Sequence, residues 1–345
     1  MGHLADKTML NELNQLPEHF FEIEANTIYQ ILPGPSLIHL AGRREQPLFV
    51  SILLHGNEDT GLKAMQKVLK KYQNQPLPRS LSLFIGNVDA ARHGLRRLEG
   101  QPDYNRVWAY EADLLSPEQI MTKQVLDNMA ARQVFASIDI HNNTGLNPHY
   151  ACVNDLGDAF LHLATLFSRI VVYFTTPKGV QSAAFSNICP SVTLECGKPG
   201  IIGGAEHAAG FVDAVLNLSQ FPTHPVAQHD LDLFHTVAVV KVPDHVNISV
   251  GLDDALTGLN LVSDIDYYNF RELTPDTALA DVKPANGFPV EAWDDWGNNV
   301  ADQFFVIKDN KLTIKRNIMP AMLTRDVNII RQDCLCYLME RLTLK

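Results

Sequence analysis

The stretch that decides the fold reads Leu48-Phe-Val-Ser-Ile-Leu-Leu-His55-Gly-Asn-Glu58-Asp-Thr-Gly61. Its apolar half is rich in β-branched and aromatic residues and ends in a polar, glycine-containing turn, which predicts a buried strand over 48–54. In open α/β sheets, ligands bind at the edge where such strands end. Because His55 and Glu58 are three positions apart, both side chains can reach one cation once the chain turns into a helix. The stretch therefore predicts two metal ligands at a sheet edge.

The same spacing also occurs in His19-Phe-Phe-Glu22. No strand is predicted before this second pair and its two intervening residues are aromatic, so we interpret it as a surface or packing feature. The spacing alone therefore does not identify a metal site. The interpretation of His55 and Glu58 depends on partners supplied by other strands.

Two later stretches repeat the pattern of an apolar run that ends in a polar side chain. One run covers 134–141 and ends at His141, and the other covers 190–195 and ends at Glu195; a glycine-containing turn follows each. After Gly61 apolar residues recur at helical intervals and the next strand is predicted over 81–86, and this strand–helix–strand order implies a parallel crossover unit. Residues 116–132, before the first of the two runs, are predicted to form a helix that begins at Ser116-Pro117-Glu118, where serine can cap it and proline suits the first turn. The three predicted strands are therefore expected to deliver their last side chains to the same edge.

Two histidines and one glutamate form a ligand set found at catalytic zinc sites, where a fourth position stays open for water or substrate. His55, Glu58 and His141 supply this set, which predicts one zinc ion per chain. A glutamate in the apolar frame of Glu195 is costly unless it is paired or functional. Since a partly desolvated carboxylate near a cation can exchange protons near neutral pH, Glu195 is the candidate general base.

A long polar loop over 87–108 is rich in arginine, with Arg92, Arg96, Arg97 and Arg106. Loops of this length inside a compact domain are usually functional or disordered. Arginine presents a planar fork that matches a carboxylate, so a loop of this kind beside a metal predicts a small carboxylated substrate. For each arginine taken alone, a solvated basic loop is the alternative interpretation.

Composition limits the classes of protein to consider. With 345 residues and 46% hydrophobic content, the chain can build a full core, so it is not a disordered protein. A formal net charge of −11 argues against a general affinity for nucleic acid or an anionic membrane. The five cysteines show no C-x-x-C spacing, which predicts reduced thiols rather than disulfides or a cysteine-bound zinc.

Location and domain organisation follow from the same sequence. The N-terminus shows no secretory signal and the apolar runs are too short to span a bilayer, so a cytoplasmic protein is expected. Prolines at Pro222 and Pro225 mark a boundary, beyond which short alternating strands predict a small all-β domain. We therefore expect a catalytic domain over 1–222 and a β-rich domain over 223–345.

These residues resemble a known family, the succinylglutamate desuccinylase/aspartoacylase branch of the zinc carboxypeptidases. The resemblance is carried, in the family's order, by His55-Gly-Asn-Glu58-Asp-Thr-Gly61, Gly86-Asn87, Asp103-Tyr-Asn-Arg106-Val-Trp108, Asp139-Ile-His141-Asn-Asn-Thr144 and Leu194-Glu195-Cys-Gly197. It implies an α/β fold with a zinc-carboxypeptidase-like mixed sheet flanked by helices, and a smaller C-terminal all-β domain.

The resemblance also implies roles for individual residues. Zinc is held by His55, Glu58 and His141; Glu195 and Arg96, or Arg97 in its place, are catalytic; Asp139 orients a histidine ligand; Asn105 and Arg106 contact the substrate carboxylate. We also predict that the substrate is lined by Asn142, Asn143 and Thr144, which differ from the lining of typical succinylglutamate desuccinylases. Where aspartoacylases place a further substrate-binding arginine, shortly before the catalytic glutamate, this chain has Ala183-Ala-Phe-Ser186. A substrate different from theirs is therefore expected.

The function predicted is that of a zinc-dependent amidohydrolase that cleaves the amide bond of a small N-acyl amino acid. A metallocarboxypeptidase acting on a short or modified peptide is the first alternative, because the same metal chemistry serves both. A catalytically silent binding protein that keeps the pocket is the second. We expect the protein to bind a small carboxylated substrate and neither nucleic acid nor a membrane. A homo-oligomer is compatible with the sequence.

Overall fold

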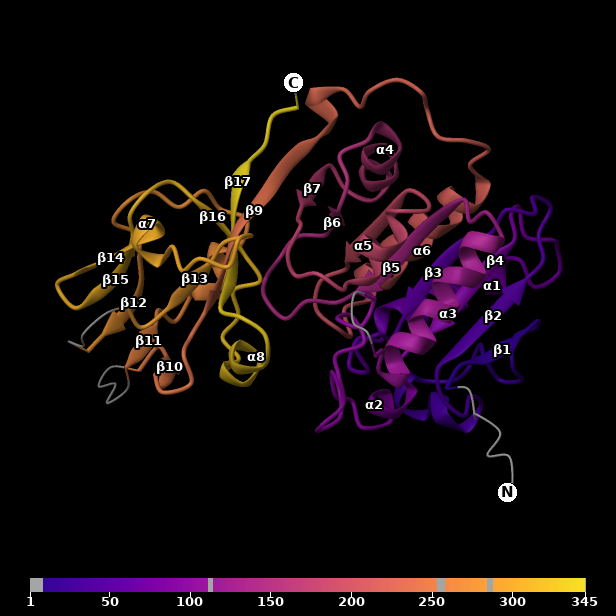
Figure 1. Ribbon diagram of the computed structural model, residues 1–345, viewed down its shortest axis with the longest axis horizontal. Coiled ribbons are helices and arrows are strands. Elements are labelled where there is room, and N and C mark those ends of the chain that lie inside the picture. Colours follow the sequence, from indigo (N-terminus) through magenta and orange to yellow (C-terminus); the bar gives the residue numbers. More distant parts are fainter. Residues whose placement is uncertain (1–8, 111–113, 253–257, 284–287, 345) are drawn as a thin grey trace. The chain divides into compact units, whose positions relative to one another are not determined.

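The computed structural model describes residues 9–110, 114–252, 258–283 and 288–344 (Figure 1). The chain folds into two compact units. The first contains the described residues up to Asn142 together with His149–Asp232, and the second contains Asn143–Pro148 together with the described residues from Leu233 onward. The units thus divide at 232 rather than at the expected 222, and the short segment Asn143–Pro148 belongs with the second unit.

The first unit is built on one mixed sheet. Its strands, in spatial order, are β1 (Asn11–Leu13), β2 (Ser36–Leu40), β4 (Leu81–Ile85), β3 (Leu48–Ile52), β5 (Ala136–His141), β8 (Ser191–Glu195), β6 (Tyr150–Val153) and β7 (Ile170–Tyr173). The central strands β4, β3, β5 and β8 run parallel to one another, whereas β2 and β6 run antiparallel to their neighbours β4 and β8. The predicted parallel arrangement of the three site-bearing strands is confirmed.

Helices cover both faces of this sheet (Figure 1). The helices of this unit are η1 (Ala25–Gln30), α1 (Thr60–Lys71), α2 (Val88–Arg92), α3 (Pro117–Ala131), α4 (Asp158–Phe167), α5 (Gln181–Phe185), α6 (Ile202–Asn217) and η2 (Gln228–Asp230), of which η2 has no buried residue. The start of α3 is fixed as the sequence predicts, because the Ser116 hydroxyl accepts from Gln119 N and the Gln119 side chain accepts from Ser116 N.

The strands of the centre are buried on both faces, as expected of a parallel sheet between helices. All five residues of β3 are buried. On one face Phe49 stacks on Phe185 of α5, with ring centroids 4.4 Å apart, and both join a cluster with residues of α3. On the other face Ile52 lies against Gly61 in the first turn of α1. The alternation along β3 thus assigns each helix to its side.

The second unit is mostly β-structure, as the sequence predicts. One set of antiparallel strands has the order β13 (Glu291–Trp293), β9 (Asp232–Lys241), β17 (Cys336–Arg341) and β16 (Met319–Ala321). The other has the order β10 (Ile248–Val250), β11 (Leu259–Leu261), β12 (Ala278–Val282), β15 (Lys311–Ile314) and β14 (Phe305–Lys308). Three short helices join these strands, η3 (Ile265–Tyr268), α7 (Ala301–Phe304) and α8 (Val327–Gln332).

Gly61 gives a test of how closely α1 must approach the sheet. A Cβ at this position would lie 2.7 Å from Ile52 Cγ2 and 3.3 Å from Ile140 Cβ. We predict that Gly61→Ala lowers the free energy of unfolding by about 1–3 kcal/mol, the usual cost of overpacking a core. Denaturant unfolding measures this change.

Gly210 is the matched control, because it lies in an α-helix with nothing within 4 Å of an added Cβ. Gly210→Ala should raise the unfolding free energy by up to about 1 kcal/mol through helix propensity alone. Equal effects of the two substitutions would contradict the close packing of α1 on β3.

Candidate metal centre

The metal centre begins with the turn after β3. Leu53, the next residue, has φ of 53°, a left-handed conformation that is uncommon for leucine. Its carbonyl accepts from Asn87 N at 2.6 Å, and a Cβ on Gly86 would lie 3.1 Å from the same oxygen. The Gly86-Asn87 motif therefore holds the turn that presents His55, and a side chain at Gly86 would crowd this turn, because its Cβ would also lie 2.9 Å from Leu54 Cδ2.

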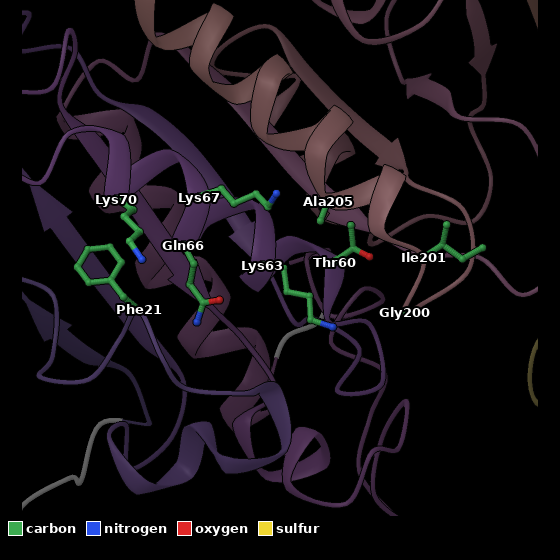
Figure 2. Close-up of a pocket in the computed structure, with 9 residues that line it drawn as sticks. All are labelled: Phe21, Thr60, Lys63, Gln66, Lys67, Lys70, Gly200, Ile201 and Ala205. Atoms are coloured by element: carbon green, nitrogen blue, oxygen red, sulfur yellow. The ribbon is translucent and has the colours of Figure 1, made fainter.

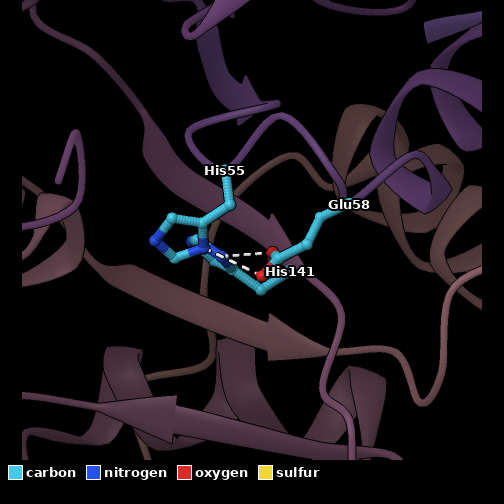
Figure 3. A group of neighbouring side chains, drawn as sticks. All are labelled: His55, Glu58 and His141. Atoms are coloured by element: carbon cyan, nitrogen blue, oxygen red, sulfur yellow. Dashed lines mark hydrogen bonds and ion pairs between the residues drawn. The ribbon is translucent and has the colours of Figure 1, made fainter. Parts of the chain in front are cut away.

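His55, Glu58 and His141 converge as the sequence predicts (Figure 3). Glu58 Oε1 lies 2.8 Å from His55 Nδ1, and Glu58 Oε2 lies 2.8 Å from His141 Nδ1. One ligand atom from each of the three side chains lies within 4.8 Å of the others, and all three residues are buried. Among the residues that the structure describes, this is the one such group with at least three metal-ligating side chains.

In each histidine, the ring nitrogen that faces away from Glu58 is hydrogen-bonded to an aspartate. His55 Nε2 donates to Asp103 Oδ1 at 3.0 Å, and His141 Nε2 donates to Asp139 Oδ2 at 2.7 Å. The Ser51 hydroxyl donates to the other oxygen of Asp139 at 2.6 Å. Proteins commonly orient metal-binding histidines in this way, because a proton fixed on the outer nitrogen leaves the inner lone pair for the metal.

The pKa values show how strongly the charges in this cluster interact. Burial alone would raise the pKa of Glu58, but the charges of His55 and His141 outweigh it and hold the pKa far below its usual range. Burial likewise opposes ionisation of Asp103, yet its pKa is lowered by the hydrogen bond from His55 and by the charge of Arg96. Burial would lower the pKa of His141, whereas Asp139 and Glu58 raise it well above its usual value.

The donor set and its charge fit a divalent cation. Carboxylates only accept hydrogen bonds, so the inward Nδ1 atoms of both rings carry protons when they face Glu58. A metal ion replaces these protons with bonds to the same atoms. With neutral imidazoles, the carboxylates of Glu58, Asp103 and Asp139 and the one guanidinium of Arg96 sum to two negative charges, which a divalent cation cancels.

The structure distinguishes the two candidate catalytic arginines. Arg96 reaches the centre through Asp103 Oδ2, to which its Nε and Nη2 atoms donate at 3.1 and 2.9 Å. Arg97 instead donates to the carbonyl of Gln101 in an exposed part of the loop. Arg96 is therefore the arginine next to the metal centre, and Asp103 connects it to His55. The sequence pattern did not predict this role of Asp103.

Asn105 and Asn142, both predicted to contact substrate, have protein partners. Asn105 Oδ1 accepts from Gln181 N at 2.9 Å, and its Nδ2 lies 3.2 Å from His141 Nε2. Asn142 N donates to Glu58 Oε2 at 3.1 Å, and its side chain donates to Thr60 Oγ1 and to the carbonyl of Gly197. Their contact with substrate remains a prediction; their visible effect is to fix the metal ligands.

The structure also gives contacts for the remaining predicted residues. Glu195 pairs in register with His141 across β5 and β8, so the two residues stand side by side on one face of the sheet. Arg106 donates from Nη1 to the carbonyl of Asn105 at 2.8 Å. Asn143 and Thr144 belong to the second unit, where Asn143 Oδ1 accepts from Asn147 Nδ2 at 3.1 Å.

A surface cavity of about 360 Å³ lies beside this centre over α1 and the start of α6 (Figure 2). Lys63, Lys67 and Lys70 extend from α1 along it, and Lys67 pairs with Glu206 at 2.8 Å. None of the three metal ligands lines the cavity, which meets the centre only at Thr60. We therefore assign the chemistry to the histidine cluster and not to this cavity.

Comparison with known families agrees with this geometry. Residues 46–221, just over half of the chain, match the succinylglutamate desuccinylase/aspartoacylase catalytic domain. The chain belongs to this family. It is therefore an enzyme, a hydrolase of the succinylglutamate desuccinylase/aspartoacylase type. The matched range of the family contains the whole histidine cluster and Glu195. No curated protein matches the chain.

Solved structures of the family share the fold. Succinylglutamate desuccinylase from Chromobacterium violaceum is 18% identical, with a TM-score of 0.52 and coverage of 88% of this chain and 87% of that chain. Succinylglutamate desuccinylase from Vibrio parahaemolyticus is 10% identical, with a TM-score of 0.59 and coverage of 94% of this chain and 96% of that chain. Murine aminoacylase 3 is 13% identical, with a TM-score of 0.54 and coverage of 88% of this chain and 97% of that chain. The fold predicted from the family resemblance is confirmed over both units.

Within the described part of the chain, no helix has the length and apolar character needed to cross a membrane.

The two aspartates behind the histidines generate a prediction about metal affinity. We expect Asp103→Asn and Asp139→Asn each to weaken zinc binding by about 10–100-fold, because a neutral amide no longer polarises the imidazole or fixes its proton. Competition with a chromogenic chelator measures the dissociation constant.

Asp127→Asn serves as the control, since Asp127 is exposed and forms an ion pair with Lys123 on the surface of α3. It should leave the zinc dissociation constant unchanged. Wild-type affinity in both buried variants would contradict the orienting role of the aspartates.

Proposed function

We propose that this enzyme is a zinc-dependent hydrolase that cleaves the amide bond of a small N-acyl amino acid. The observation that carries the proposal is the buried convergence of His55, Glu58 and His141, with a carboxylate behind each imidazole. Three nitrogen and oxygen ligands with an open fourth position are the usual catalytic zinc set. The family, whose named activities include desuccinylation and deacylation, supports the same reaction type.

His55, Glu58 and His141 would hold the metal, and Asp103 and Asp139 would keep the two rings in the binding tautomer. When bound, zinc supplies Lewis-acid chemistry, lowering the pKa of a coordinated water and polarising a carbonyl group. Buried surroundings strengthen these electrostatic effects relative to water, since the local dielectric constant is low. The burial of all three ligands is therefore part of the proposal.

Glu195 is the proton carrier of the proposed reaction. Its register with His141 supports this role, because the two residues stand side by side at the ends of β8 and β5. The carboxylate takes a proton from the attacking water and passes it to the leaving amine, so that one group serves as base and then as acid. Burial raises the pKa of the Cys196 and Cys152 thiols well above the usual value. The negative charge of the neighbouring Glu195 raises these pKa values further.

Asn105 and Arg106 would bind the substrate carboxylate, and Arg96 would help to polarise the scissile carbonyl. Arg96 is adjacent to the centre through Asp103, and Arg106 follows Asn105, which lies beside His141. At the position of the further arginine of aspartoacylases, α5 carries Ala183 and Ala184, and Phe185 is buried in the core against Phe49. Because this helix offers no cation, we propose that the substrate differs from that of aspartoacylases.

A substrate screen tests the reaction class. Zinc-loaded enzyme is assayed with N-acetyl, N-formyl and N-succinyl amino acids, and with short peptides that have a free C-terminus. Release of an amino acid from the acyl compounds supports the proposal, and hydrolysis restricted to peptides identifies a carboxypeptidase. Bound zinc without turnover of any compound contradicts a catalytic role.

Glu195→Gln tests the proton carrier. We predict that this variant binds zinc like the wild type and loses at least about 100-fold in kcat, because the amide cannot exchange the proton. Metal analysis and initial rates are measured on the same preparation.

The control is Glu206→Gln, which changes an exposed glutamate whose partner is Lys67. It should keep both zinc and activity. Native turnover by Glu195→Gln would show that the base lies elsewhere.

A further inference from the structure

The metal chemistry of the first unit makes no use of the surface cavity over α1 and the start of α6, which we call the lysine-lined cavity (Figure 2). Lys63, Lys67 and Lys70 follow one another at helical intervals, so they stand on one face of α1. Of the described residues that line the cavity, none is an aspartate or a glutamate. The cavity is therefore a concave, positively charged surface on a chain whose formal net charge is −11.

Two of the three lysines have acidic partners, but these partners lie outside the lining. Lys63 pairs with Asp59 one turn before it, and Lys67 pairs with Glu206 of α6 at 2.8 Å. The side chains of Lys67 and Glu206 are 50% and 59% exposed, and ion pairs this exposed contribute little to stability. Within the described part of the chain, Lys70 forms no ion pair. An anion that enters the cavity therefore meets one unpaired ammonium group and two weakly paired ones.

The other walls of the cavity are partly apolar and are held in place. Phe21 and Ile201 line it opposite the lysines' helix, and Ile201 is an exposed hydrophobic residue. Gln66 donates from Nε2 to the carbonyls of Phe20 and Ile23, both at 2.8 Å, which fastens the segment that carries Phe21 to α1. Small-molecule sites are usually preformed in this way and measure about 300–1,000 Å³. The cavity volume of about 360 Å³ suits a small organic molecule.

The lysine-lined cavity and the metal centre are separate sites. Thr60 lines the cavity, and its hydroxyl accepts from Asn142 Nδ2 at 2.8 Å. Asn142 in turn donates from its backbone to Glu58 Oε2 at 3.1 Å, so Thr60 and Asn142 stand between the cavity and a metal ligand. A molecule held by the lysines therefore does not need the metal for binding.

We propose that the lysine-lined cavity binds a small organic anion, with a carboxylate or phosphate group at the lysines and a short apolar part against Phe21 and Ile201. Lysine ammonium groups are compact point charges that suit either anionic group. Covering the exposed apolar wall adds a hydrophobic contribution that an inorganic ion cannot supply. The inference goes beyond the proposed reaction and does not depend on it, because it concerns binding at a second site.

Calorimetric titration of the full-length enzyme tests the site with hexanoate and with phenyl phosphate, and inorganic phosphate is the probe without an apolar part. We expect at least one organic anion to bind once per chain, and inorganic phosphate to bind at least about tenfold more weakly. The tighter of the two organic anions identifies the head group. The dissociation constant should be the same in zinc-free and zinc-loaded enzyme. If neither organic anion binds, if inorganic phosphate binds equally well, or if binding requires zinc, the inference is wrong.

Lys70→Gln removes the unpaired charge, and glutamine keeps a helix propensity close to that of lysine. We expect the dissociation constant of the tighter anion to rise by about tenfold. Lys71→Gln is the matched control, because Lys71 is the next residue of α1 and pairs with Asp213 at 2.6 Å instead of lining the cavity. It removes the same charge and should leave the dissociation constant unchanged. Equal weakening by the two substitutions would reveal a general effect of net charge and contradict the site.

Lysine labelling gives a second readout on the wild-type enzyme, so it does not depend on the folding of a variant. The bound anion should slow the reductive methylation of Lys67 and Lys70 and leave that of Lys71 unchanged, as measured residue by residue by mass spectrometry. Equal protection of all three lysines, or no protection at a saturating concentration of the anion, overturns the inference.

Discussion

The register of the parallel strands β3, β5 and β8 is the constraint on which the rest of the structure depends. Ser51 pairs with Asp139, and His141 pairs with Glu195. In a sheet whose side chains alternate between faces, a slip of one residue moves every one of these groups to the opposite face. The register therefore fixes which polar groups meet, and burial of the strands on both faces fixes the register.

Charge explains why these groups stay together in a buried place. Several carboxylates in a low dielectric repel one another unless cations are placed between them. Here the two imidazoles and Arg96 alternate with Glu58, Asp103 and Asp139. A divalent cation that replaces the two protons on the inner nitrogens would keep this charge balance, so a structural argument and a chemical argument lead to the same ligand set.

Much of this centre was predictable from the sequence, because strand ends carry local signals. An apolar run followed by a polar, glycine-containing turn identified His55, His141 and Glu195, and the absence of such a run set His19 apart. The role of Asp103 was not predictable from spacing. Its contact with His55 joins a loop residue to a strand end 48 positions away, and only the fold brings them together; a carboxylate within a family motif was the available signal.

The loop after His141 is a second case in which contacts between distant parts of the chain could not be predicted from the sequence. Asn143 and Thr144 were predicted to line the substrate site, but the sequence does not show which unit holds them. The contacts that decide it join Asn147 to Met322 and Asn269 to Leu323, across segments far apart in sequence. The predicted boundary at 222 likewise followed prolines, whereas the compact units follow contacts and divide at 232.

The most direct test of the central claim is X-ray absorption at the zinc edge of the purified, zinc-loaded enzyme, with the Glu58→Gln variant beside it. The account predicts one zinc per chain, bound by two imidazole nitrogens and further oxygen, with no sulfur ligand and with impaired binding in the variant. A sulfur ligand, or an unchanged spectrum at full occupancy in Glu58→Gln, would contradict the assignment of His55, Glu58 and His141.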